Sequence, residues 1–270
     1  MKKLLIALIL LPLMATATQW GSRTLAPGLN NAQDNYPACI KNNGGVYEIT
    51  SYELYYHSYS GNYQWGSRQK CTIPTLISSI TIDPNQHKAI VVDDNNNIRW
   101  ANSSNGLNWS WGTILSAWER SGQRPTSVSC AWNGPNKWLY VAYNDGIVWG
   151  APYPYSNPQV INVGGTCKYV AVRPQTGDYL IVQGWNGSNR DLYELKGFGS
   201  SWGSRTNISE VNSGNDEYSP VLGVISQEHE NLLLWSTAGS VGGNDIYYST
   251  GNDTSAVTPT SLGRVKAMFH

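Results

Sequence analysis

Hydrophobic and polar positions along the chain follow the pattern of short strands. Runs rich in Val, Ile, Leu, Tyr and Trp recur, and clusters of Pro, Asn, Asp or Gly bound each run. Strands and turns have this appearance in sequence, because β-branched and aromatic residues suit a pleated surface and small polar residues suit turns. No window carries apolar residues at sustained helical spacing. The pattern predicts an all-β fold.

The runs form five similar passages, each of three strands. A passage begins with a short apolar strand, turns at a polar cluster and continues through a second and a third strand. The predicted strands are 38–41, 46–52 and 54–58; 79–82, 88–92 and 98–102; 128–132, 138–143 and 147–150; 169–172, 179–184 and 191–195; and 221–225, 232–237 and 245–249.

A repeated phrase, Trp-Gly-Ser-Arg, gives the period of these passages. It occurs at 20–23, 65–68 and 202–205, and a weaker copy, Trp-Gly-Thr, occurs at 111–113. Successive copies are 45, 46 and 91 residues apart, and the last interval is about twice the first two. A silent copy is therefore expected at 157–161. Four short strands per unit at such a period predict the four-stranded antiparallel blades of a β-propeller.

Both ends of the chain carry strand-like segments outside the five passages. Segment 18–30 contains an extra strand that looks like a fourth strand, and segment 264–270 looks like a first strand. We therefore expect five full blades and a partial sixth blade made by the two termini. The ends either close the ring within one chain or are donated to a neighbouring copy, because an exposed edge pairs with either. Head-to-tail donation would build a fibre or a closed ring.

The first seventeen residues have the features of a secretory signal. Lys2 and Lys3 precede an apolar run at 4–14, and Ala15-Thr16-Ala17 is a small-residue cleavage site. We expect residues 1–17 to be removed, leaving one β-propeller domain at 18–270 that is secreted and extracellular or at the cell surface. No later segment is apolar enough to span a membrane.

Composition narrows the choice of partner. The chain has 18 basic and 18 acidic residues, and only 13% of its residues are charged. Nucleic acid and anionic membranes call for a basic face, so neither is expected as a partner. The aromatic residues are 12 Trp, 17 Tyr and 2 Phe. Trp and Tyr have a polar edge, so they can contact solvent or a sugar as well as the core.

Four cysteines in a secreted chain predict two disulfides, with three possible pairings. Cys39 and Cys130 fall in first strands, whereas Cys71 and Cys167 fall in segments that lead to the next blade. The pairs Cys39–Cys71 and Cys130–Cys167 would repeat one connection twice. No Cys-x-x-Cys pair or His cluster accompanies them. We therefore expect no metal site and no cofactor.

The predicted loop between the third and fourth strands of the second passage has a distinctive sequence. It is Ser103-Ser104-Asn105-Gly106-Leu107-Asn108-Trp109. The loop resembles the Asp-box, or bacterial neuraminidase repeat, of sialidase-like propellers, which is Ser-x-Asp-x-Gly-x-x-Trp. Asn105 stands in place of the Asp, and the loop is one residue shorter. The resemblance implies that Ser and Asn side chains close the turn on backbone N–H groups, while Trp packs beneath it.

The same resemblance bears on catalysis. A sialidase-like site would need three arginines around a carboxylate, a Tyr–Glu nucleophile pair and an Asp acid, and the family's early Arg-Ile-Pro-like motif is absent. A shared fold does not carry an active site with it. We therefore predict no catalytic residues, and a sialidase-like glycoside hydrolase is only the third hypothesis.

The sequence favours a non-catalytic extracellular structural or adhesive protein. Copies of itself would be its partners, assembled through the terminal strands. The main alternative is a lectin that binds cell-surface glycans through blade aromatics and arginines. Its candidate residues are Trp65, Arg68, Trp111, Trp202 and Arg205. The competing interpretation of these residues is structural, with each Trp packed between blades and each Arg either stacked on it or extended outward to solvent.

Overall fold

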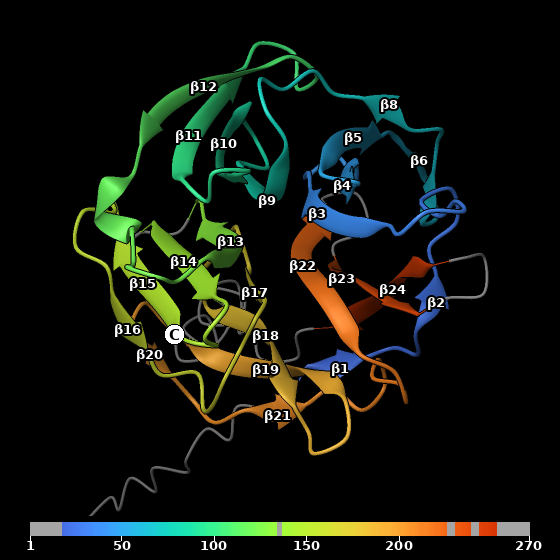
Figure 1. The fold of residues 1–270 in the computed structure, drawn as a ribbon. Coiled ribbons are helices and arrows are strands. Elements are labelled where there is room, and N and C mark those ends of the chain that lie inside the picture. The colour runs from blue at the N-terminus through green and yellow to red at the C-terminus, as the bar shows by residue number, and fades with distance from the viewer. Residues whose placement is uncertain (1–17, 134–136, 226–229, 239–242, 253–270) are drawn as a thin grey trace, which may run out of the picture.

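The computed structural model describes residues 18–133, 137–225, 230–238 and 243–252. Over these residues the chain is a β-propeller (Figure 1). Five antiparallel blades surround a central axis, and the described part contains one short 3-10 helix, η1 (Ser116–Trp118). The predicted all-β propeller is confirmed.

The blades follow one another in chain order, each with its first strand at the axis. The first blade is β3 (Tyr36–Ile40), β4 (Val46–Thr50), β5 (Glu53–His57) and β8 (Gln69–Lys70), with a side hairpin of β6 (Tyr59–Gly61) and β7 (Gln64–Trp65). The second is β9 (Ile77–Ile82), β10 (Lys88–Asp93), β11 (Ile98–Ser103) and β12 (Trp109–Ile114). The third is β13 (Pro125–Ala131), β14 (Trp138–Tyr143), β15 (Val148–Pro152) and β16 (Gln159–Ile161).

The last two blades have divided outer strands. The fourth blade is β17 (Val170–Val172), β18 (Tyr179–Trp185) and β19 (Arg190–Phe198), whose outer edge pairs with β20 (Ser201–Trp202) and β21 (Thr206–Asn207). The fifth is β22 (Glu217–Ile225), β23 (Glu230–Ala238) and β24 (Asn244–Asn252), whose outer edge pairs with β1 (Gln19–Trp20) and β2 (Thr24–Leu25).

This closure corrects the predicted sixth blade. Five full blades plus a partial sixth were expected. Instead, β24 of the fifth blade receives its outer partner from the N-terminal segment. Trp20 pairs with Gly251, and Leu25 pairs with Tyr247. The unpaired edge of β24 and the extra N-terminal strand therefore satisfy each other within one chain. The predicted extra strand at 264–270 lies outside the described residues.

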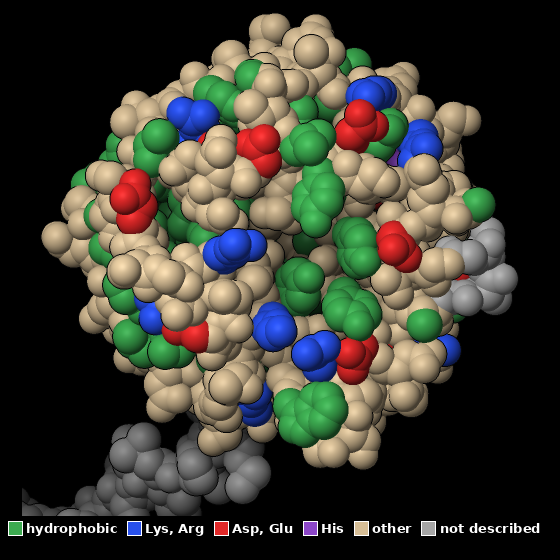
Figure 2. All heavy atoms as spheres, in the orientation of Figure 1, with side chains coloured by type: hydrophobic (Ala, Val, Ile, Leu, Met, Phe, Trp, Pro, Cys, Tyr) green, Lys and Arg blue, Asp and Glu red, His purple; other side chains and the backbone are tan. Residues whose placement is uncertain are grey.

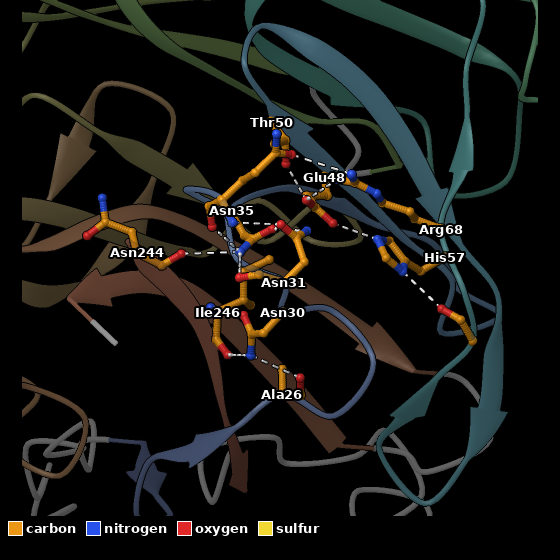
Figure 3. Close-up of polar contacts among 12 residues, drawn as sticks. Ala26, Asn30, Asn31, Asn35, Glu48, Thr50, His57, Arg68, Asn244 and Ile246 are labelled. Carbon is orange, nitrogen blue, oxygen red and sulfur yellow. Dashed lines mark hydrogen bonds and ion pairs between the residues drawn. The ribbon is translucent and has the colours of Figure 1, made fainter. Parts of the chain in front are cut away.

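Asparagines in the linker between β2 and β3 extend the closure (Figure 3). The Ile246 N–H donates to Asn30 Oδ1 at 2.5 Å, and Asn30 Nδ2 donates to the Ile246 carbonyl at 3.0 Å. The backbone N–H of Asn35 donates to the Asn244 carbonyl at 2.9 Å. The Asn30 side chain thus makes the two hydrogen bonds that a backbone partner of Ile246 would make. The N-terminal segment therefore runs beside β24 along most of its length.

The Trp-Gly-Ser-Arg phrase forms a β-bulge in the outer strand. Trp202 pairs with Gly197 and Thr206 with Glu194, so the outer strand carries one residue more than its neighbour. In the first and fifth blades the strand that carries the phrase also has one residue more than its neighbour. The weaker copy, Trp-Gly-Thr at 111–113, lies at a register shift between β11 and β12. A bulge bends a strand and increases its twist, which suits the rim of a blade. The predicted silent copy is confirmed as β16, the fourth strand of the third blade.

The hydrophobic core lies between blades. Five buried clusters each combine residues from two neighbouring blades. Second strands are covered on both faces, so they are continuous apolar runs; all six residues of β14 are buried.

The two predicted disulfides are absent, and all four cysteines are buried free thiols. Cys130 packs with residues of the second and third blades, whereas Cys167 packs between the third and fourth blades. The predicted Cys130–Cys167 pair is wrong because the two side chains lie on opposite faces of one blade. Cys39 and Cys71 do share a cluster. Burial raises the pKa of Cys39 to about 11 and that of Cys71 to about 12, so both stay protonated at neutral pH.

Candidate ligand-binding site at the mouth of the central channel

The inner strands enclose a central cavity of about 800 Å³. Hydroxyl groups join these strands across the blade boundaries. The N–H groups of Val128 and Cys130 donate to Ser79 Oγ at 3.0 Å and Thr81 Oγ1 at 3.2 Å. The next blade repeats the pattern, with Ser127 and Ser129 accepting bonds of 2.9 Å from β17. These bonds satisfy N–H groups that β-pairing leaves free at the axis.

A chain of amide side chains crosses the far end of the cavity. Gln175 Nε2 donates to Asn42 Oδ1 at 2.8 Å, and Asn42 Nδ2 donates to Asn85 Oδ1 at 2.5 Å. These residues come from the fourth, first and second blades, and the first and fourth blades are not neighbours in the ring. Lys41 Nζ also donates to the Asp83 carbonyl at 2.7 Å. We infer that the channel is closed at this end and is a blind cavity open at the other face.

Tyrosines gather at the open end. Tyr36, Tyr52 and Tyr169 line the cavity, and the ring of Tyr218 meets that of Tyr169 edge-on, with centroids 6.4 Å apart. Tyr52, on the β4–β5 turn, is 60% exposed. Burial raises the pKa of Tyr36, Tyr169 and Tyr218. Their hydroxyls are therefore protonated at neutral pH, and those of Tyr36 and Tyr169 can donate hydrogen bonds to a ligand.

Basic side chains stand beside the tyrosines. Arg124, which precedes β13, lines the cavity and is exposed, and its guanidinium has no hydrogen-bond or ion-pair partner among the described residues. Arg190 Nη1 contacts Asp216 at 2.9 Å, and Asp216 also accepts a bond of 3.0 Å from Tyr218. Figure 2 shows this face, where hydrophobic and Lys or Arg side chains surround a central hollow.

Two further large side chains are exposed among the elements of this face. Leu76 borders the cavity just before β9 and is 46% exposed, and Trp185 ends β18 and is 57% exposed. The mouth therefore combines aromatic surface, hydroxyl donors and an unpaired guanidinium around a concave site, which is the usual make-up of a small-ligand pocket.

The predicted sugar-binding residues lie elsewhere, on the outer strands of separate blades. Trp65 is buried, while Trp111 and Trp202 are half-buried. The repeated arginine stacks on a tyrosine of the third strand of its own blade. The distances from Arg Cζ to the ring centroid are 5.0 Å for Arg23 on Tyr247, 4.3 Å for Arg68 on Tyr55 and 5.5 Å for Arg205 on Tyr193. Arg205 also donates to the Val163 carbonyl. The stacking partner is thus a tyrosine, and the predicted stacking on Trp is not what forms.

The loop at 103–109 has the geometry that the Asp-box resemblance implies. Ser103 Oγ accepts the Gly106 N–H at 2.8 Å, and Asn105 Oδ1 accepts the N–H groups of Leu107 and Asn108, both at 2.9 Å. Trp109 is buried, and its Nε1 donates to the Gly106 carbonyl at 3.0 Å. In the fourth blade Trp202 Nε1 likewise donates to a glycine carbonyl three residues earlier, at 2.9 Å. The loop thus has a structural role.

The three arginines of the repeated phrase do not meet at one site. Arg23, Arg68 and Arg205 belong to three different blades. Two Tyr–Glu hydrogen bonds do form. The Tyr55 hydroxyl donates to Glu53 at 2.7 Å on the first blade, and the Tyr179 hydroxyl donates to Glu194, where both side chains are buried. The indole N–H of Trp20 donates to Tyr179 Oη at 3.1 Å. The buried pair therefore anchors the N-terminal strand to the fourth blade.

A second buried polar group lies in the first blade (Figure 3). Glu48 accepts a hydrogen bond from Thr50, and its Oε2 lies 2.6 Å from His57 Nε2. His57 Nδ1 lies 3.0 Å from the Gly66 carbonyl. Each ring nitrogen of His57 thus lies within hydrogen-bond distance of an oxygen, so the ring links Glu48 to the segment that follows β7. The pair is 2% and 0% exposed, out of reach of a ligand.

The described residues contain no group of three His, Cys, Asp or Glu side chains placed to hold a metal ion. In the polar turn after β10, Asp93 Oδ1 accepts the N–H groups of Asn95 at 3.0 Å and Asn97 at 2.9 Å, as in an ordinary Asx turn. Over the same part of the chain, no helix is long and apolar enough to cross a membrane.

Sequence reasoning missed the residues of the mouth. A signal was present, because Tyr36, Tyr169 and Tyr218 each stand at or next to the beginning of a first strand. The predicted first strands began at 38, 169 and 221, so Tyr36 and Tyr218 lay outside them and the repeat was not visible. Arg124 belongs to no repeated motif. Only its position beside the central cavity, which the structure shows, marks it as a candidate binding residue.

Comparison with known proteins supports the fold alone. No protein-family model and no curated protein matches the chain. Among solved structures it is similar to the RRP9 WD40 repeats, with a TM-score of 0.51 and 8% identity over 87% of this chain and 100% of that chain. It is also similar to a luciferin-regenerating enzyme, with a TM-score of 0.46 and 10% identity over 87% of this chain and 80% of that chain.

A third similar structure is Raptor of Chaetomium thermophilum, with a TM-score of 0.44 and 13% identity over 80% of this chain. The chain spans only 18% of the Raptor chain. Identities this low show a shared β-propeller fold and no function. Membership of the sialidase-like Asp-box group stays a prediction.

Proposed function

We propose that this chain is a secreted, non-catalytic β-propeller that binds glycans at the mouth of its central cavity. The observation that carries the proposal is the central cavity of about 800 Å³, bordered by Tyr36, Tyr52, Tyr169 and Arg124. The guanidinium of Arg124 has no polar partner among the residues that the structure describes. Its volume lies in the range of small-ligand pockets, roughly 300–1,000 Å³.

A carbohydrate suits this surface better than a purely apolar ligand does. A sugar ring has one face of C–H groups, which packs on an aromatic ring, and an edge of hydroxyls. Tyr36 and Tyr169 offer aromatic surface and a donating hydroxyl in the same side chain, and Tyr218 adds aromatic surface. The guanidinium of Arg124 adds several donors in a fixed plane. Ser78, Ser129 and other wall residues add hydroxyl groups inside the cavity.

A glycan array with the mature chain tests this proposal. We expect specific binding that Tyr52→Ala and Arg124→Gln each abolish or weaken about tenfold, the effect of losing one good contact. Tyr153→Ala is the matched control, because Tyr153 is 63% exposed and follows β15, at the end of the third blade away from the mouth. Glycan binding that survives both mouth substitutions but is lost in Arg68→Ala or Arg205→Ala would assign the lectin site to the outer strands instead.

The composite fifth blade favours a second candidate function, self-assembly into an oligomer or fibre. Its outer strand comes from the other end of the chain, and β1 and β2 contribute two residues each. The N-terminal strand of a second copy could make the same pairs with β24, so exchange between copies would lose no hydrogen bonds. Such an exchange of N-terminal strands is one way in which the predicted assembly could occur.

Covalent locking tests assembly without deleting a strand. Thr24 and Tyr248 are paired residues on β2 and β24, so Thr24→Cys combined with Tyr248→Cys should tie the closure within one chain. We expect oligomers or fibres of the native protein by light scattering and electron microscopy, and monomers of the oxidised variant. A native protein that is monomeric at every concentration would refute self-assembly.

A further inference from the structure

A groove between the third and fourth blades opens beside the mouth. It has a volume of about 300 Å³ and is formed by the β14–β15 turn, the segment before β17 and the β18–β19 region. Asn144 borders both the groove and the central cavity. The two hollows are therefore adjacent, and a ligand longer than one sugar could extend from one to the other.

Unpaired positive charge collects along this path. Lys168 lines the groove and Arg124 lines the cavity next to it; both are exposed, and neither side chain has a polar partner within the described part of the chain. The carboxylate of the groove, Asp145, is held by Arg120 through bonds of 2.8 and 3.2 Å. An anionic ligand group would thus meet cations that no internal carboxylate neutralises.

Two carboxylates that line the cavity, those of Asp34 and Asp94, lie away from the groove. Asp34, before the first blade, accepts the Asn244 N–H at 2.7 Å, and Asp94 belongs to the β10–β11 turn of the second blade. Both line the cavity, but neither lines the groove. The rim is therefore polarised, with its basic side toward the groove. Electrostatic complementarity of this kind selects the sign of a partner's charge.

An exposed aromatic platform lies in the groove. Trp185 is part of its lining and is 57% exposed, a large indole surface without a packing partner that would hide it. A flat aromatic ring beside cationic groups suits the C–H face of a sugar whose edge carries a carboxylate.

We propose that the groove is a second subsite and that cavity and groove together bind a linear carbohydrate chain bearing uronic-acid carboxylates. This inference rests on the glycan binding proposed above. Lys168 and Arg124 bind carboxylates of the chain, and Trp185 stacks on one of its rings.

Calorimetric titration of the mature chain with a galacturonic acid trimer tests the inference, beside the fully methyl-esterified trimer and the free monosaccharide. The ester keeps the rings and removes the charge. We expect the acid trimer to bind at least about tenfold more tightly than either, and added salt to shrink its advantage over the ester. Lys168→Gln should weaken binding of the acid and leave that of the ester unchanged. Arg124→Gln should weaken binding of the acid more than that of the ester, whereas Trp185→Ala should weaken both equally.

Lys88→Gln is the matched control. Lys88 is an exposed lysine at the start of β10, at the end of the second blade that lies away from the mouth. Equal binding of acid and ester would overturn the uronic-acid assignment while leaving glycan binding intact. Equal affinities for trimer and monosaccharide would overturn the second subsite. Binding of neutral glycans on the array with no binding of the acid trimer would overturn the whole inference, and failure of every glycan to bind would refute the proposed function as well.

Discussion

At the scale of single residues, the chain buries several ionisable groups that serve stability. Glu217 begins β22 and is fully buried, and its Oε1 accepts bonds of 3.0 and 2.5 Å from the N–H and hydroxyl of Ser213. Its Oε2 has no hydrogen-bond partner among the described residues. Burial, and secondarily the charge of Asp191, raises the pKa of Glu217 from 4.5 to about 7. An ionised Glu217 therefore costs the folded state free energy.

This raised pKa gives stability a defined pH dependence. The folded state holds the proton more tightly than the unfolded state, so the stabilisation is complete below pH 4.5 and is lost as pH rises through about 7. In Glu217→Gln we expect this component of the pH dependence to vanish, and the variant to exceed the native protein in unfolding free energy at pH 8 by up to about 3 kcal/mol. Urea denaturation across this pH range measures it. Glu119→Gln, at an exposed carboxylate, should retain the native profile.

At the scale of elements, blades are joined by hydroxyls as well as by apolar packing. Alternating Ser and Thr side chains on β9 and β13 accept backbone N–H groups of the following inner strand. An inner strand has no β-partner on its axial edge, so these bonds replace the missing ladder. The same alternation places the intervening side chains in the cores between blades.

Ser127→Ala tests this role. Ser127 is buried, and its Oγ accepts the Val170 N–H at 2.9 Å. Its loss leaves a buried N–H unsatisfied, so we expect the unfolding free energy to fall by about 1–3 kcal/mol. Ser78→Ala, at an exposed serine of β9, removes the same atom and should leave stability nearly unchanged. Equal effects of the two substitutions in urea denaturation would contradict the role given to the inner-strand hydroxyls.

At the scale of the whole molecule, the N-terminal segment completes the fifth blade and ties it to the fourth. Trp20 is only 6% exposed, and it packs with residues of the fourth and fifth blades. Its indole N–H donates to Tyr179 Oη, and the adjacent Gly21 N–H donates to the Thr250 carbonyl at 2.9 Å. One residue thus joins the first strand of the chain to two blades formed later in the sequence.

Trp20→Ala should therefore weaken the closed ring. Truncation of a buried Trp costs about 3–5 kcal/mol through lost apolar contact and the cavity left behind. We expect an earlier urea midpoint, together with faster amide exchange of β24. Trp185→Ala is the counterpart, because Trp185 is exposed and should affect ligand binding without affecting stability. A Trp20 variant as stable as the native protein would show that the ring does not depend on this contact.

Local features of the chain were predictable from its residues. Strand positions, the period and the outer-strand copy at 157–161 follow from alternation and turn residues, which act over a few neighbours. The loop at 103–109 was equally local, since Ser103, Asn105 and Trp109 complete its hydrogen bonds among themselves. Sequence alone therefore determined the all-β class, the blades and the turn chemistry.

Tertiary structure decided whatever depends on which distant segments meet. β24 pairs with a strand more than two hundred residues earlier, because ring closure brings an unpaired edge and an unpaired strand together. Cys130 and Cys167 suit a pairing by spacing, yet the blade between them separates their side chains. Tyr36, Tyr169 and Arg124 lie at one mouth only because inner strands from different blades line the same axis. Each of these residues stands at or next to the end of its strand that meets this face. Local preference determines each strand, but packing determines its neighbours.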